Sequence, residues 1–209
     1  MKAKVILLIS GLVLMACKYP KRVEDKVDSI ASIESGPGKI GDERYLVVPG
    51  ISVGEISLGA DMEAVGKKLG KPQAGDAAMG KAWGIWYQKD SIAGHPSELA
   101  IYSAYRDTSM RVKDVKQIRI NSRKFKTQDG FTIGKNFEDT QSKFPGMSKA
   151  ALYINENKDT VLVYDSKSDG ISFEFLKGKS IALTVHPKNV SIVNTYLTLH
   201  PEWKILSGL

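Results

Sequence analysis

The chain has 209 residues, 42% of them hydrophobic, and a formal net charge of +7 at pH 7. This hydrophobic content is enough for one substantial core or two small ones. The single cysteine excludes a scaffold of disulfides, and the positive charge at first suggests a nucleic-acid ligand.

The N-terminus contains the one long apolar run, VILLISGLVLMA, from Val5 to Ala16. As a helix this run spans about 18 Å, whereas the hydrocarbon layer of a bilayer is about 30 Å thick, so a membrane span is excluded. Lys2 and Lys4 precede the run, and a basic start before a short apolar segment is typical of an export signal. We therefore predict that residues 1–16 are a signal peptide.

The end of this run, Leu14-Met15-Ala16-Cys17, resembles a bacterial lipobox. The resemblance implies that the sulfur of Cys17 receives diacylglycerol and that Cys17 becomes the first residue of the mature protein. Several acyl chains on one cysteine would hold the protein on a membrane, and no thiol would remain for a disulfide, a nucleophile or a metal site. Lys18 stands where an aspartate would favour the inner membrane. We expect anchoring to the outer membrane, facing the periplasm.

Removal of the signal peptide takes away Lys2 and Lys4 and lowers the formal charge to +5. An exported, lipid-anchored protein meets little nucleic acid, so we expect no nucleic-acid partner. The envelope offers other anionic partners: phosphorylated lipids, cell-wall polymers and acidic proteins. This location overrides the usual interpretation of a basic chain.

The rest of the chain divides into a tether and two repeats. Residues 17–43 mix both charges with Ser, Gly and Pro, which is typical of a flexible tether. Residues 56–69, ISLGADMEAVGKKL, align without a gap on residues 131–144, FTIGKNFEDTQSKF, at a constant offset of 75. This self-similarity indicates a duplication. The predicted repeats are residues 44–124 and residues 125–209, the latter with a C-terminal tail.

Each repeat begins with a predicted short helix. Asp61 and Asn136 occupy matched positions where a side-chain oxygen can accept from free N–H groups and cap a helix. Gly70 and Pro145 follow the helices and end them. Three runs with period-two alternation come next in each repeat, as expected for half-buried antiparallel strands. These runs are WGIWYQ, ELAIYSAYR and VKQIRIN in the first repeat, and DTVLVYD, GISFEFLKG and SIALTVH in the second.

This order predicts an α+β fold of two tandem repeats, each a short helix followed by a three- to four-stranded antiparallel sheet, with the helices on one sheet face. The motif I-x-L-G, followed by a helix that ends L-G-K-P, is similar to that of secreted β-lactamase inhibitor proteins and of the small lipoprotein of the outer-membrane β-barrel assembly machine. VPGISVGEISLG, LAIYSAYRD and KTQDGFTIG also resemble segments of bacterial lipoproteins of uncharacterised function. The first two families imply protein–protein binding, although such motifs indicate a fold more than a function.

Motifs for catalysis are weak. GDAAMGKA, residues 75–82, has the spacing of a phosphate-binding loop, but Ala82 replaces the hydroxyl that would bind Mg²⁺, so we interpret it as a flexible Gly/Ala loop. His95, His186 and His200 each precede a proline and do not form a helical pair, so they indicate strand ends and turns. We predict no catalytic residue, no metal site, no cofactor and no enzymatic activity.

The strongest charge feature is the stretch of residues 111–126, with seven positive residues and one negative. Strand alternation that turns Ile118 and Ile120 inward places Gln117 and Arg119 on the outer face.

The same alternation turns Ile85 inward with Leu99, and it leaves Trp86, Tyr102 and Arg106 outside. Trp, Tyr and Arg are enriched at interface hot spots. The alternative is that Trp86 and Tyr102 pack against the other repeat or a tail. The predicted partner-binding residues are Trp86, Tyr102, Arg106, Gln117, Arg119, Arg123 and Lys124.

These observations predict a membrane-anchored envelope lipoprotein that acts as a non-catalytic binding, adaptor or inhibitor-like module for a protein partner. Two alternatives stay open. A basic binder of anionic cell-wall or lipid polymers would lose affinity steeply with salt. An envelope hydrolase would need a deep pocket with converging His and carboxylate groups.

Overall fold

The computed structural model describes residues 42–92, 95–192 and 203–208. The predicted signal peptide, the lipidation site Cys17 and nearly all of the tether lie outside these residues, as does His200. In the part of the chain that the structure describes, no helix has the length and hydrophobicity needed to span a bilayer.

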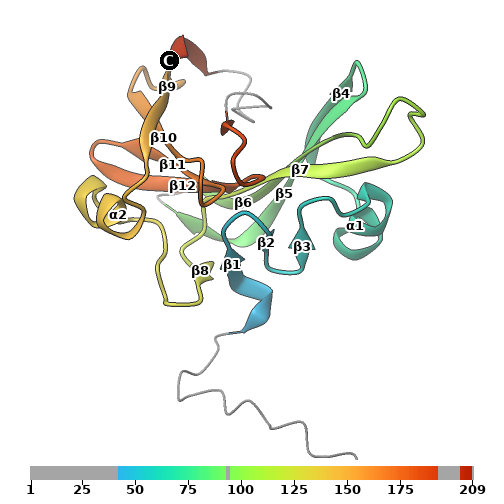
Figure 1. Ribbon diagram of the computed structural model, residues 1–209, viewed down its shortest axis with the longest axis horizontal. Coiled ribbons are helices and arrows are strands. Elements are labelled where there is room, and N and C mark those ends of the chain that lie inside the picture. The colour runs from blue at the N-terminus through green and yellow to red at the C-terminus, as the bar shows by residue number, and fades with distance from the viewer. Residues whose placement is uncertain (1–41, 93–94, 193–202, 209) are drawn as a thin grey trace, which may run out of the picture. The chain divides into compact units, whose positions relative to one another are not determined.

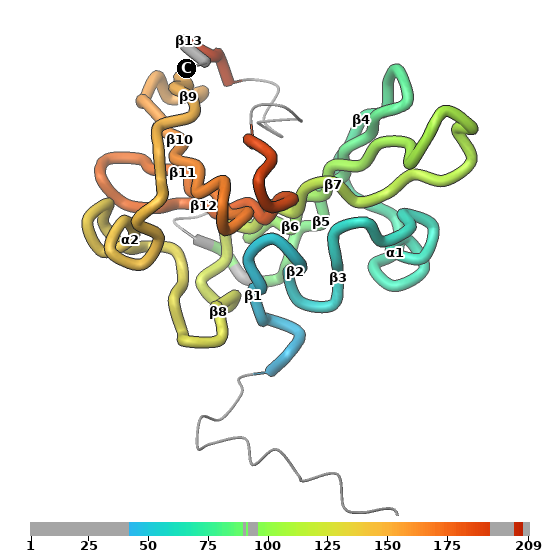
Figure 2. The backbone as a smooth tube through the Cα atoms, viewed as in Figure 1, coloured from blue at the N-terminus to red at the C-terminus, as the bar shows by residue number. Residues whose placement is uncertain are grey.

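A small sheet forms where the described chain begins. After a short 3₁₀ helix (Glu43–Tyr45), β1 pairs antiparallel with β2 and parallel with β8, so the N-terminal strands lie beside a segment from the middle of the chain (Figure 2). In spatial order its strands are β3 (Ile56–Ser57), β2 (Ser52–Val53), β1 (Leu46–Val48) and β8 (Lys126–Thr127).

A second, long sheet contains the remaining nine described strands, and all neighbours in it run antiparallel. Figure 1 shows it from β4 at the right to β9 at the left. In spatial order the strands are β13 (Lys204–Gly208), β9 (Ser148–Ile154), β10 (Thr160–Ser166), β11 (Ile171–Leu176), β12 (Lys179–Val185), β7 (Lys113–Ile120), β6 (His95–Tyr105), β5 (Lys81–Ile92) and β4 (Ala74–Ala78).

Two short helices each precede a group of strands of the long sheet, β4 to β7 after the first helix and β9 to β12 after the second. The predicted caps of both helices are confirmed. Helix α1 (Met62–Leu69) begins at Asp61, whose carboxylate accepts from the N–H of Glu63 at 2.8 Å. Helix α2 (Phe137–Lys143) begins at Asn136, whose side chain accepts from the N–H of Asp139 at 2.7 Å. The local sequence therefore determines where both helices start.

The predicted α+β fold of two helix-plus-sheet repeats is wrong. The described chain is mostly β-strand, with two short helices, and its strands form two sheets. Strand β12 of the second segment pairs with β7 of the first, so the strands after both helices belong to one sheet. The small sheet lies outside the predicted pattern altogether. The division at residue 124 stays a prediction, since both segments belong to one compact unit.

The main core lies between one face of the long sheet, the small sheet and the two helices. Val65 of α1 and Phe144 after α2 pack in the same hydrophobic cluster as Val47 of β1. From the long sheet this cluster includes Ile101 and Phe173, which are fully buried. One continuous core therefore joins both sheets and both helices.

Candidate functional site

Trp86 lies on the opposite face of the sheet from the predicted one. It is directly opposite Leu99 and belongs to the main core, with only 7% of its surface exposed, while Ile85 faces the other way beside Tyr102. The indole N–H donates to the carbonyl oxygen of Gly70 at 3.1 Å. Apolar residues occupy both alternating sets of positions in this strand, so the sequence pattern alone could not show which set faces the main core.

Tyr102, Gln117 and Arg119 do share a face, as predicted, but that face is covered. Tyr102 lies directly opposite Gln117, and all three side chains are buried. The side-chain amide of Gln117 donates to the carbonyl oxygen of Ile192 at 3.5 Å. These residues therefore line the second, polar face of the long sheet and not an open docking surface.

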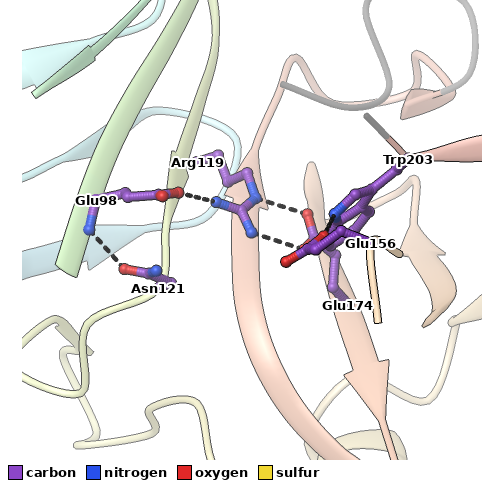
Figure 3. Close-up of polar contacts among 6 residues, drawn as sticks. All are labelled: Glu98, Arg119, Asn121, Glu156, Glu174 and Trp203. Atoms are coloured by element: carbon purple, nitrogen blue, oxygen red, sulfur yellow. Dashed lines mark hydrogen bonds and ion pairs between the residues drawn. The ribbon is translucent and has the colours of Figure 1, made fainter. Parts of the chain in front are cut away.

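Arg119 is the centre of this polar face (Figure 3). Its guanidinium donates twice to the carboxylate of Glu174, at 2.7 and 2.8 Å, and once to Glu98 at 3.0 Å. Only 4% of the Arg119 surface is exposed. A bidentate pair of this kind fixes both side chains in one geometry. We call these three residues the arginine clamp.

The arginine clamp crosses the junction between the two groups of strands. Arg119 lies on β7, Glu98 on β6 and Glu174 on β11, two strands away from β7. The β7–β12 ladder at this junction is short. Its opposed pairs are Ile120 with Leu183, Arg119 with Thr184, and Ile118 with Val185. The clamp therefore adds side-chain bonds where few backbone pairs hold the sheet together.

The two carboxylates of the clamp stabilise the charged form of Arg119. Burial alone lowers the pKa of Arg119, but the attraction and hydrogen bonds of Glu174 and Glu98 outweigh this effect and raise that pKa above its ordinary value. Glu98 is also fixed through its backbone N–H, which donates to the side-chain oxygen of Asn121 at 2.6 Å. The guanidinium of Arg119 is thus engaged by both carboxylates of the clamp.

A second buried polar group was missed in the sequence. His186, directly after β12, contacts a carboxylate oxygen of Asp165 through Nε2 at 2.9 Å and the carbonyl oxygen of Pro187 through Nδ1 at 3.1 Å. The other oxygen of Asp165 accepts from the N–H of Ile192 at 3.0 Å. Asp165 and His186 lie too far apart in sequence for spacing to reveal the pair.

The remaining predicted site residues lie apart from the arginine clamp. Arg106 pairs with Asp114 at 2.8 Å near the β6–β7 loop, and this hydrogen-bonded partner holds the pKa of Asp114 below its ordinary value. Arg123 and Lys124 are exposed in a turn, where the guanidinium of Arg123 lies close to Gly134. The seven predicted residues therefore do not form one surface.

The GDAAMGKA segment is not the predicted flexible loop. Residues 74–78 form β4, which pairs with β5 and ends the long sheet. Gly75 to Ala78 are exposed, and Asp76 is the one charged residue of the strand. Among the described residues β4 has a partner on one side only. A strand at the edge of a sheet presents backbone N–H and C=O groups on its outer side, and on β4 the N–H of Ala77 is already engaged by the carboxylate of Asp76 at 2.7 Å.

Within the described residues, no group of three or more His, Cys, Asp or Glu side chains is placed to hold a metal ion. No family model, curated protein or solved structure matches the chain.

Proposed function

We propose that this protein is a bacterial envelope lipoprotein that binds a protein partner by strand addition at the free edge of β4. Cys17 supplies the lipid anchor, and Lys18 directs the protein to the outer membrane, facing the periplasm. The observation that carries the binding role is the exposed edge of β4, which can pair with an extended segment of another chain.

The composition of β4 favours an incoming strand. Proteins protect sheet edges with lysine, proline or inward-pointing charges. The span Ala74–Ala78 contains no lysine and no proline, and its carboxylate, on Asp76, bonds to the backbone N–H of Ala77. Small side chains on the strand let another backbone approach closely. The edge therefore provides backbone hydrogen bonds with little steric obstruction.

The polar face supports binding over catalysis. Its buried charges are engaged with one another, Arg119 with Glu174 and Glu98, and His186 with Asp165. A general acid or base must be able to transfer a proton to a substrate within hydrogen-bond reach. The arginine clamp instead has the geometry of a structural brace.

The anchor is tested first with the full-length precursor in bacteria supplied with an alkyne-labelled fatty acid. We expect the wild-type protein to take up the label and to fractionate with outer membranes, and Cys17→Ser to do neither. Label on the Cys17→Ser variant, or an unlabelled wild-type protein, would refute the anchor.

The partner is tested by capture from solubilised envelope at low and high salt. We expect one protein to be retained at both salts by the wild type and lost with the double variant Ala77→Lys/Ala78→Lys, because lysines on an edge oppose strand addition. The matched control is Gln128→Lys/Gln141→Lys, which adds the same charge at exposed positions elsewhere. Retention of polymers at low salt only would favour the anionic-polymer alternative, because surface charge interactions are screened by salt.

A further inference from the structure

An apolar groove lies at the other end of the long sheet from β4, beside α2. Its volume is about 420 Å³, and Phe137, Leu162, Tyr164 and Phe175 provide most of its wall. Phe137, Leu162 and Tyr164 are only half-buried, so α2 leaves this part of the sheet face uncovered. Small-molecule sites commonly have this size and an apolar lining with few polar groups.

The groove is preformed by ring packing. The centroids of Phe137 and Tyr164 lie 4.6 Å apart, and Tyr164 and Phe175 meet edge to face at 5.7 Å. Phe175 is buried in the main core and fixes the other two rings. These contacts hold the wall rigid, so a ligand would lose little free energy in ordering it.

The apolar surface continues along the sheet beyond the groove. Leu162 lies directly opposite Leu152 of β9, and Thr160 lies opposite Ile154. Leu152 and Ile154 are half-buried too. The half-buried apolar strip therefore continues from β10 to β9 and suits a long, narrow occupant.

The backbone around the groove indicates what that occupant is. Strand β10 pairs with β9 on one side and β11 on the other, and β11 also pairs with β12. These ladders use the N–H and C=O groups of the strands, so the groove gives a peptide backbone few partners. A bound peptide would bury polar groups without hydrogen bonds, which is costly. A hydrocarbon chain has no such groups.

The charges at the rim indicate an anionic head group. Lys149 is exposed, lies directly opposite Tyr164 on the same sheet face, and forms no ion pair among the described residues. Lys177 lines the groove at its other end but is paired with Asp159 at 2.9 Å. Glu138 and Asp139, both exposed in the first turn of α2, are further carboxylates at this end of the sheet. Lys149 is therefore one exposed cation on this sheet face without an ion pair among the described residues, although it is not among the residues that line the groove itself.

We propose that this groove binds a free long-chain fatty acid, with the acyl chain over Leu162 and Tyr164 and the carboxylate at Lys149. The site is independent of the β4 edge, which lies at the opposite end of the sheet. Affinity increases with each methylene group that enters the groove, by about two- to fourfold.

The test uses the mature chain, residues 17–209 with Cys17→Ser so that no acyl anchor competes. Octanoate, decanoate and dodecanoate are titrated by calorimetry below their micelle concentrations, with decyltrimethylammonium as the cation of matched tail length. We expect the dissociation constant to fall about two- to fourfold per methylene, and the cation to bind at least tenfold more weakly than decanoate.

Variants locate the site. Leu162→Asn and the groove-filling Thr160→Phe are each expected to weaken decanoate binding at least tenfold. Lys149→Gln is expected to weaken it about threefold to tenfold while the chain-length dependence is retained, and Lys81→Gln, far from the groove, is the matched control. Two groove variants are used so that the test still gives an answer if one of the two proteins does not fold. Three results would overturn the proposal: no binding of any carboxylate, binding unchanged in both groove variants, or binding to phosphatidylglycerol vesicles alone.

Discussion

At the scale of single residues, Arg119 is a buried cation that pairs with both Glu174 and Glu98. Its removal would leave Glu174 and Glu98 facing each other in a buried site. Breaking a buried ion pair by removing one partner costs about 3–5 kcal/mol. We expect this loss in the free energy of unfolding for Arg119→Met, measured by urea denaturation.

A double variant separates pairing from packing at the arginine clamp. Arg119→Met/Glu174→Leu should recover more than about 1 kcal/mol of the loss, because the second substitution removes one of the two carboxylates that lose the guanidinium. Arg106→Met, at a half-exposed pair, should cost less than Arg119→Met. Additive effects of the two clamp substitutions would show that the pair contributes no coupling.

The contribution of Asp114 to the stability of the fold should depend on pH. The hydrogen bond and charge of Arg106, together with the charge of Lys116, outweigh the opposing effect of burial and lower the pKa of Asp114 in the folded protein. A lowered carboxyl pKa stabilises the fold above the ordinary aspartate value of about 3.9, and this stabilisation is lost as the pH falls through the folded pKa. Asp114→Asn should therefore be less stable than wild type at pH 7, with a difference that shrinks below about pH 4. A difference that stays constant down to pH 3 would contradict this account.

At the scale of elements, the helix caps were predictable because they depend on neighbours in the sequence. Asn136→Ala removes the acceptor for the N–H of Asp139 and should destabilise the protein by about 1 kcal/mol. Asn136→Asp preserves an acceptor and should stay within a few tenths of a kcal/mol of the wild type. Equal losses in the two variants, measured by thermal unfolding, would contradict the side-chain cap as the source of the stabilisation.

Strand β4 shows where local information fails. Its residues AGDAA lack the β-branched and aromatic side chains that favour strands, so the composition suggested a loop. The partner strand decides the outcome, since β4 pairs with β5 along its whole length from Ala74 to Ala78. The wrong prediction for the face of Trp86 has the same cause. Its hydrogen-bond partner, Gly70, lies at the end of α1, and a strand pattern holds no information about that helix.

At the scale of the whole molecule, the fold class could not be derived from periodicity. Alternation found strands in the segments around Ile101, Ile118 and Phe173, but it says nothing of which strand pairs with which. The junction of β7 with β12 joins segments about 65 residues apart and makes one sheet of two expected ones. The partners of Arg119 lie outside the basic stretch, Glu98 at 21 and Glu174 at 55 positions away in the sequence. The charges of that stretch therefore appeared free although one of them is the centre of a buried clamp.

The shared face of Tyr102, Gln117 and Arg119 was the part of the candidate site that alternation did predict. Its burial was not predictable, because the residues that close over it come from other parts of the chain, such as Ile192. This difference moves the proposed binding role from the polar face to the edge of β4. It also turns the clamp into a support for the sheet that presents that edge.

The central claim is that β4 takes up a strand from a protein partner, and site-specific photo-crosslinking in intact cells tests it most directly. The photoreactive residue p-benzoylphenylalanine replaces Ala77 on the edge or, as a control, Gln141 on α2, both exposed. The account predicts that one protein is cross-linked from position 77 and not from position 141, and that Ala78→Lys abolishes the product. Equal cross-linking from both positions, or a product that persists with Ala78→Lys, would contradict strand addition at β4.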